Sequence, residues 1–191
     1  MNIQEYDILN AIFTTTNPTQ RSLADCSGHS LGIVNRSIKM LTSDGYLTTT
    51  MQPTDKAITL YNHSVPQNAV ILAAGFGMRM VPINTETPKG LLEIHGEALI
   101  ERIIRQLHEA NIHNIYIVVG FMKEQYEYLI DEYGVTLIVN TDYASKNNLH
   151  SLNLASGYLK NSYIIPCDIW CKDNPFHTHE LYSWYMVSDT Q

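Results

Sequence analysis

The chain has 191 residues, a hydrophobic fraction of 45% and a formal net charge of −7, values that suit one or two globular domains. It contains no apolar run near the roughly 18 residues that a membrane-spanning helix needs. The start, MNIQEYDILN, lacks the basic and apolar regions of a secretory signal. Three cysteines without the spacing of a disulfide framework fit a reducing compartment. We therefore expect a cytoplasmic protein with no membrane partner.

The N-terminal third predicts three helices and a β-wing. Apolar residues at helical spacing predict helices over residues 3–13, over residues 22–26 and from about Ser30. The third helix shows one apolar stripe, formed by Leu31, Val34, Ile38 and Leu41. Residues 48–61, TTTMQPTDKAITLY, look like two short β-rich runs around a Pro-Thr-Asp turn.

This order resembles bacterial winged-helix domains of the MarR type over about residues 3–62, by pattern and not by signature residues. If the unit bound DNA, its recognition helix would enter the major groove and present Ser30, Gly32, Asn35, Arg36 and Lys39. A domain that only docks or dimerises fits equally well. Residues 1–66 carry four basic and five acidic side chains, a net charge of −1, which leaves −6 for the remainder. Clustered Lys and Arg, which nucleic-acid affinity needs, are not evident.

The polar stretch 62–67 is the expected domain boundary, which gives domains over residues 1–66 and 67–191. Beyond it strands and helices alternate. Strands are expected at residues 69–74, 114–120, 135–140 and 162–168, and helices at about 99–109, 123–130 and 149–158. Such alternation predicts an α/β domain with a mostly parallel, Rossmann-like sheet and helices on both faces.

The first of these strands runs into a glycine loop, ILAAGFGMRM, at residues 71–80. A dinucleotide fingerprint needs a third glycine where Met80 stands, and a P-loop also fails at that position. What remains is a loop in which Gly75 and Gly77 let backbone N–H groups approach phosphates, while Arg79 adds a positive charge. A second cation, Lys89, follows Pro88.

Residues 72–100, LAAGFGMRMVPINTETPKGLLEIHGEALI, resemble the nucleotidyltransferase signature LxxGxGxRxxPxTxxxPKxLxxIxGxPLI. Two positions depart from it: Asn84 replaces a threonine and Ala98 a proline, and neither change removes a charge. The stretches IVVGFMKEQYEYL, YASKNNLHSL and YIIPCDIW extend the resemblance toward bacterial phosphocholine cytidylyltransferases, over about residues 68–188. Sugar-1-phosphate nucleotidyltransferases share the first third of this region, so they remain an alternative.

The resemblance implies a nucleotide-diphospho-sugar transferase-like fold and a reaction of CTP with phosphocholine that needs Mg²⁺ and forms CDP-choline and pyrophosphate. An oxygen of the phosphate monoester would attack the α-phosphorus of CTP, so the protein would act by positioning and charge stabilisation. The implied catalytic residues are Arg79 at the β- and γ-phosphates, Lys89 at the α-phosphate and Asp168 as the Mg²⁺ ligand. The main chain of Leu72, Ala73, Ala74, Gly75 and Gly77 would contact the nucleotide.

Further residues have two readings. Asn147, Asn148 and Ser151 could order a loop over the nucleotide or cap the following helix, and Gly120 could admit the nucleotide or simply form a turn. His177 and His179 lack a nearby third ligand, so we expect surface histidines and no zinc site. Aromatic candidates for a quaternary ammonium are Trp170, Tyr182, Trp184 and Tyr185, although core packing explains such residues as well.

The resemblance also implies that family members continue beyond this sequence, with strands that complete the sheet, an acceptor pocket and a second acidic metal ligand. We therefore expect an incomplete sheet, weak nucleotide binding, little turnover and self-association through the exposed sheet. A different class of function is a DNA-binding regulator whose second domain senses a nucleotide. DNA binding and nucleotide preference separate these alternatives.

Overall fold

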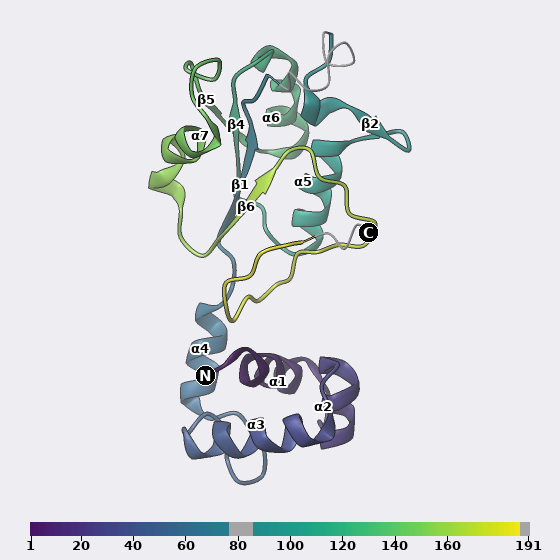
Figure 1. Ribbon diagram of the computed structural model, residues 1–191, viewed down its shortest axis with the longest axis vertical. Helices are drawn as coiled ribbons and strands as arrows, with labels where there is room; N and C mark the ends of the chain where they lie inside the picture. The colour runs from purple at the N-terminus through teal and green to yellow at the C-terminus, as the bar shows by residue number, and fades with distance from the viewer. Residues whose placement is uncertain (77–85, 188–191) are drawn as a thin grey trace. The chain divides into compact units, whose positions relative to one another are not determined.

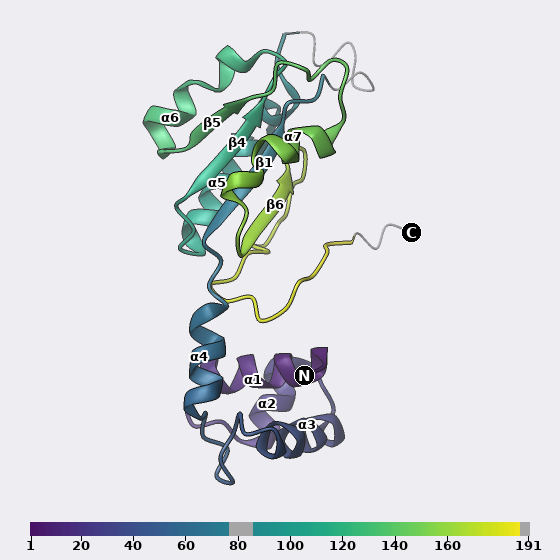
Figure 2. The ribbon, with the colours of Figure 1, turned by 90° about the vertical axis from the view of Figure 1, so that its left-hand side faces the viewer.

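The computed structural model describes residues 1–76 and 86–187, which divide into two units with separate cores (Figures 1 and 2). The first unit comprises Met1–Val65 together with the segment from His179, and the second comprises Pro66–Thr178. The expected boundary lies one residue from this division. The segment from His179, which the sequence pattern placed in the second domain, instead groups with the first unit.

Four helices form most of the first unit (Figure 1). They are α1 (Ile3–Thr14), α2 (Gln20–Ser27), α3 (Leu31–Ser43) and α4 (Asp55–His63). Asn2 and Glu5 form a capping box at the start of α1, and the side chain of Thr19 caps α2. The predicted α1, α2 and α3 are confirmed. In α3 the residues Val34, Ile38 and Leu41 are buried, but Leu31 is 45% exposed and does not belong to the apolar stripe.

The predicted wing is wrong in its second run. Leu47 and Pro53 form one antiparallel bridge, and the N–H of Thr54 donates to the carbonyl of Tyr46 at 3.0 Å. The residues after Thr54 form helix α4 and not a strand. Thr54 is an N-cap residue followed by Asp55, a helix-start signal that outweighs the β-propensity of the short sequence KAITLY.

A four-stranded parallel sheet forms the centre of the second unit, with the strand order β5-β4-β1-β6. The strands are β1 (Asn68–Ala73), β4 (Ile115–Val119), β5 (Thr136–Val139) and β6 (Ser162–Pro166). All four predicted strands are confirmed. Their alternating side chains enter two hydrophobic clusters, because successive residues of a strand point to opposite faces of the sheet. Ala69, Ile71 and Ala73 face one cluster, whereas Val70 and Ala74 face the other.

Helices cover both faces of this sheet, as expected (Figure 2). Helix α5 (Leu99–Glu109) buries Ile100, Ile103, Ile104 and Leu107 against one face, where α6 (Tyr128–Tyr133) adds Leu129. Helix α7 (Asn148–Leu154) packs Leu152 on the other face. The helix expected over residues 123–130 is divided into the 3-10 helix η3 (Lys123–Tyr126) and α6, and the 3-10 helix η4 (Ser156–Tyr158) follows α7.

Three short elements of the second unit were not predicted. The 3-10 helix η2 (Lys89–Leu91) is followed by a hairpin of β2 (Glu93–Ile94) and β3 (Glu97–Ala98). His95 and Gly96 connect these strands with positive φ angles of 56° and 80°, the backbone that a two-residue hairpin turn prefers. Two-residue strands are too short to give an alternating pattern in the sequence.

Residues 179–182 pack within the first unit. The ring of His179 stacks on Tyr61 at 3.9 Å between centroids, and Tyr61 stacks on Phe13 at 4.0 Å. The hydroxyl of Tyr182 donates to Oδ1 of Asp7 at 3.0 Å. Among the described residues, no helix has the length and apolar character needed to cross a membrane.

Candidate functional site at the carboxyl edge of the sheet

The strand order places a topological switch point between β1 and β6. The chain passes from β1 to β4 and then to β5 in one direction, and returns to place β6 on the other side of β1. In open parallel sheets, ligands bind outside the carboxyl ends of the strands at such a point. Here the ends are followed by Ala74 and Gly75 after β1 and by Cys167 and Asp168 after β6.

Lys89 and Asp168, two of the predicted catalytic residues, meet at this edge. Lys89 begins η2 directly after Pro88, and its ammonium forms an ion pair with Oδ2 of Asp168. The side chains are 27% and 34% exposed, so both remain accessible from solvent. The edge therefore presents an ammonium beside a carboxylate, the kinds of group that bind phosphate and divalent cations respectively in proteins.

Gly90 lets η2 approach β6, a role that the sequence reasoning missed. A Cβ at this position would lie 3.1 Å from the hydroxyl of Tyr126 and 3.2 Å from Cβ of Cys167. Both neighbours are buried. Burial, reinforced by the charge of Asp168, raises the pKa of Cys167 to about 12, so this side chain remains a neutral thiol. The signal was available, because a glycine directly follows the Pro-Lys pair.

Gly120 brings the ends of β1 and β4 together. A Cβ on Gly120 would lie 2.6 Å from Cβ of Tyr143 and 2.9 Å from the carbonyl oxygen of Ala74. The N–H of Phe121 donates to that carbonyl at 3.3 Å. The close packing of these protein groups requires glycine at this position, a reason that is additional to the two readings of the sequence.

Asn140, which sequence reasoning also missed, connects β5 to α7. It is 1% exposed, and its side-chain amide donates to Oγ of Ser151 at 3.0 Å. Its side-chain carbonyl oxygen accepts a hydrogen bond from the main-chain N–H of Asp142. Its main-chain N–H donates to the carbonyl oxygen of Val119. An asparagine directly after an apolar strand was the available signal, because buried amides need such partners.

The structure places the predicted loop residues in different roles. The side chain of Asn147 accepts hydrogen bonds from the N–H groups of Leu149 and His150 and caps α7. Asn148 begins that helix and is exposed, whereas Ser151 is 3% exposed and bonded to Asn140. The capping reading thus fits Asn147.

Gly77 and Arg79 lie outside the described residues, so the structure gives no geometry for them. Leu72, Ala73 and Ala74 lie at the end of β1, and the following Gly75 and Phe76 are exposed. The ring of Phe76 lies 4.3 Å from that of Phe121. No group of three or more His, Cys, Asp or Glu side chains within residues 1–76 and 86–187 is placed to hold a metal ion.

Of the four aromatic candidates, only Trp170 belongs to the second unit. The guanidinium of Arg102 lies 4.8 Å from the centre of its ring. Tyr182, Trp184 and Tyr185 belong to the first unit. The two histidines belong to different units, His177 to the second and His179 to the first.

The candidate DNA-contacting residues lie on or beside α3. Ser30 is the N-cap of the helix, and its hydroxyl oxygen accepts a hydrogen bond from the N–H of Ile33. Gly32, Asn35, Arg36 and Lys39 are exposed. The helix thus presents the predicted polar residues together, beside Met40, which is 45% exposed.

The family model described as the MobA-like NTP transferase domain matches residues 69–183. The chain belongs to this family. The second unit accordingly has the α/β nucleotidyltransferase fold, with a parallel sheet and helices on both faces.

Curated relatives share the same region. A choline-phosphate cytidylyltransferase of Streptococcus pneumoniae is 44% identical over 118 residues, or 62% of this chain and 52% of the relative. That of Haemophilus influenzae is 43% identical over 120 residues, covering 63% and 52%. A 2-aminoethylphosphonate cytidylyltransferase of Lancefieldella rimae is 41% identical over 102 residues, covering 53% and 42%.

A solved structure, the CTP:phosphocholine cytidylyltransferase of Streptococcus pneumoniae, superimposes with a TM-score of 0.58 at 43% identity. The match covers 60% of this chain and 50% of that chain. This chain thus spans about half the length of the curated choline-phosphate cytidylyltransferases that it matches.

Proposed function

We propose that the second unit binds CTP and serves transfer of its cytidylyl group to phosphocholine, releasing pyrophosphate. The meeting of Lys89 and Asp168 at the switch point carries this proposal. Support comes from the 43–44% identity to relatives named choline-phosphate cytidylyltransferases. Since no protein nucleophile is needed, the residues at this edge act by orienting phosphates and offsetting their charge.

The roles follow from charge and position. Lys89 supplies positive charge to the α-phosphate, where negative charge develops as pyrophosphate leaves. The main chain of Ala74 and Gly75 contacts the nucleotide just beyond the end of β1, where Gly75 is exposed. Arg79 keeps the role that the signature gives it, at the β- and γ-phosphates.

Asp168 offers the carboxylate for Mg²⁺. The donor set fits this ion, because Mg²⁺ commonly takes one or two carboxylates and completes its shell with waters and substrate phosphates. When bound, Mg²⁺ would offset the charge of the phosphate oxygens. In the structure the carboxylate pairs with Lys89. Triphosphate oxygens would compete with Asp168 for that ammonium, and the carboxylate would then become available.

A thermal-shift titration tests this proposal with Mg²⁺ and each of CTP, UTP, dTTP, GTP and ATP. Ligand at about a hundredfold its Kd should stabilise the unit by roughly 2.7 kcal/mol. We expect stabilisation by CTP that is lost in Lys89→Ala and in Asp168→Ala. Lys123→Ala is the matched control, because Lys123 is an exposed lysine beside Glu124. Stabilisation by another nucleotide would favour a sugar-1-phosphate enzyme, and no stabilisation by any of the five would contradict the proposal.

The acceptor is tested separately, by product analysis with phosphocholine and with 2-aminoethylphosphonate. The names of the relatives include both acceptors. Each offers a phosphoryl oxygen and a cationic nitrogen. We expect CDP-choline with phosphocholine, and preferential reaction with the phosphonate would reassign the acceptor.

We propose DNA binding by the first unit as a second candidate function. The exposed Asn35, Arg36 and Lys39 on α3 favour it. A gel-shift titration against the protein's own promoter DNA should show binding that weakens with salt and with Arg36→Ala. Lys56→Ala is the control, because Lys56 donates to the carbonyl of Asp44 at 2.8 Å. Equal binding by both variants would count against contact through α3.

A further inference from the structure

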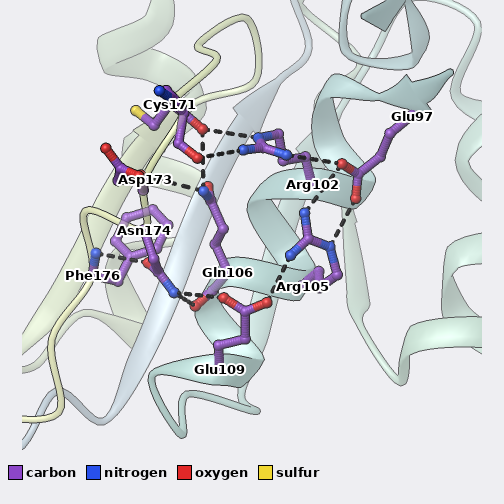
Figure 3. A network of polar contacts seen from close by, with 10 residues as sticks. Glu97, Arg102, Arg105, Gln106, Glu109, Cys171, Asp173, Asn174 and Phe176 are labelled. Atoms are coloured by element: carbon purple, nitrogen blue, oxygen red, sulfur yellow. Dashed lines mark hydrogen bonds and ion pairs between the residues drawn. The ribbon is translucent and has the colours of Figure 1, made fainter. Parts of the chain in front are cut away.

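Main-chain carbonyl groups shortly after Asp168 accept hydrogen bonds from side chains of α5 (Figure 3). Nε of Arg102 donates to the carbonyl oxygen of Cys171 at 2.9 Å, and another guanidinium nitrogen donates to that of Lys172 at 2.7 Å. The side-chain amide of Gln106 donates to the carbonyl of Cys171 at 3.2 Å. Neighbouring carbonyl groups of one short segment therefore take their hydrogen bonds from a single helix.

The same segment is also held further along. The side-chain amide of Asn174 donates to the main-chain carbonyl of Gln106 at 2.7 Å. The side-chain oxygen of Asn174 accepts a hydrogen bond from the N–H of Phe176 at 2.9 Å. Phe176 is buried in the core beneath α5. Residues 171–176, here called the β6 exit segment, thus have polar and apolar anchors on one face of the unit.

Arg102 is itself held in place. Its third nitrogen donates to Glu97 at 3.2 Å, and Arg105 donates to both oxygens of Glu97 at 2.9 and 3.1 Å. Hydrogen bonds from Arg105, with further help from Arg102, keep the pKa of Glu97 below its usual value. The ring of Trp170 lies against the guanidinium of Arg102. A guanidinium with three partners in a planar arrangement permits little change of direction.

We propose that Arg102, assisted by Gln106, is a positioning residue for Asp168. Trp170 and Cys171 follow Asp168 by two and three residues, so fixing both limits the directions that the Asp168 carboxylate can take. The inference rests on the proposed function, in which this carboxylate is the Mg²⁺ ligand. Groups that orient a metal ligand typically change metal affinity about 10- to 100-fold when they are removed.

The test compares Arg102→Gln, Arg102→Lys and Gln106→Met with Arg105→Gln. Arg105 lies on the same helix and shares Glu97 with Arg102, but in its described hydrogen bonds it donates directly to no atom of the β6 exit segment. It is linked to that segment through Glu109, which also accepts a hydrogen bond from Asn174 at 3.1 Å. Arg105→Gln therefore leaves the direct hydrogen bonds from Arg102 to the segment in place. The measured quantity is the Mg²⁺ concentration that gives half-maximal CTP binding, followed by calorimetry. CTP binding in EDTA is measured in parallel.

We expect Arg102→Gln to raise that Mg²⁺ concentration about tenfold or more, with a smaller rise in Gln106→Met and partial recovery in Arg102→Lys. Arg105→Gln should stay within about twofold of wild type. CTP binding in EDTA should not differ between variants, because the proposed effect acts only through the metal ligand. Equal effects of Arg102→Gln and Arg105→Gln, or equal losses with and without Mg²⁺, would overturn the inference alone.

A second measurement does not need nucleotide. In a Trp184→Phe background Trp170 is the sole tryptophan, since the chain has two. Arg102→Gln should increase quenching of Trp170 fluorescence by acrylamide, and Arg105→Gln should not. Unchanged quenching in Arg102→Gln would overturn the anchoring. If the wild-type chain bound no CTP under either condition, the proposed function would fail, and the inference with it.

Discussion

At Gly120 the candidate site has no room for a side chain. The missing Cβ leaves room for Tyr143 and for the carbonyl of Ala74. Neither contact can be relieved by rotating a side chain, because one is to the Cβ of Tyr143 and the other is to the main chain of Ala74. The shape of the carboxyl edge thus depends on the absence of a single methyl group.

Gly120→Ala should lower the free energy of unfolding by about 1–3 kcal/mol, the usual cost of overpacking, and should weaken CTP binding by displacing Ala74. Urea unfolding and a CTP titration would measure both effects. Gly157→Ala is the control, because a Cβ there would meet nothing within 4 Å. Similar losses in the two variants would contradict the packing argument.

Cys167 makes stability depend on pH in a defined window. Its pKa rises from about 9 to about 12 in the folded chain. At pH values between these two, the thiol of the unfolded chain has lost its proton and the thiol of the folded chain has not. The free energy of unfolding should therefore fall as pH rises above 9, with a contribution of up to about 1.4 kcal/mol per pH unit. Cys167→Ala removes this contribution and should give a shallower decline in urea unfolding at pH 9–11. If the free energy of unfolding fell equally with pH in the wild type and in Cys167→Ala, Cys167 would have an ordinary pKa.

At the scale of elements, α7 depends on its cap. Asn147→Ala leaves the N–H groups of Leu149 and His150 without their acceptor and should cost about 1 kcal/mol of stability. Asn147→Ser retains a capping oxygen and should recover most of that loss. If capping is the whole role, CTP should bind to Asn147→Ser as it binds to wild type. Weaker CTP binding with recovered stability would indicate a direct contact with the nucleotide.

Strand β6 has β1 on one side and no strand of the described residues on the other. Its Ile164 is 49% exposed, and a free strand edge favours pairing between copies. We expect light scattering to detect self-association that Ile164→Lys reduces. Ile130→Lys, a comparable change at an exposed isoleucine of α6, should not reduce it. A monomeric wild-type chain would contradict this expectation.

The sequence predicted the strands of the sheet and most helices because their apolar residues recur with a clear period. It failed at residues 55–63, where a cap and a helix follow a stretch that resembles a strand. It predicted Lys89 from the signature and Asp168 from its place at the end of a strand, and these two residues form an ion pair, but it missed Gly90 and Asn140. Gly90 and Asn140 matter through contacts with other segments of the chain. The local signals, a glycine after a Pro-Lys pair and an asparagine after an apolar strand, mark these positions but do not say which residues they contact.

At the scale of the whole molecule, each unit has its own hydrophobic core and its own tryptophan, Trp170 in the second and Trp184 in the first. Single-tryptophan variants, Trp184→Phe and Trp170→Phe, therefore report on the two units separately. We expect CTP with Mg²⁺ to raise the melting temperature reported by Trp170 and to leave that reported by Trp184 nearly unchanged. Equal shifts would show that the units unfold as one cooperative body.

The first unit is discontinuous in the chain, since Met1–Val65 and the segment from His179 belong together and Pro66–Thr178 intervenes. During synthesis the ribosome releases the N-terminal helices well before residue 179 exists. The stack of Phe13, Tyr61 and His179 therefore cannot close until the whole second unit has been translated. Domains commonly fold as they emerge, so helices α1 to α4 emerge without the segment from His179, which follows only after the last residue of the nucleotidyltransferase unit.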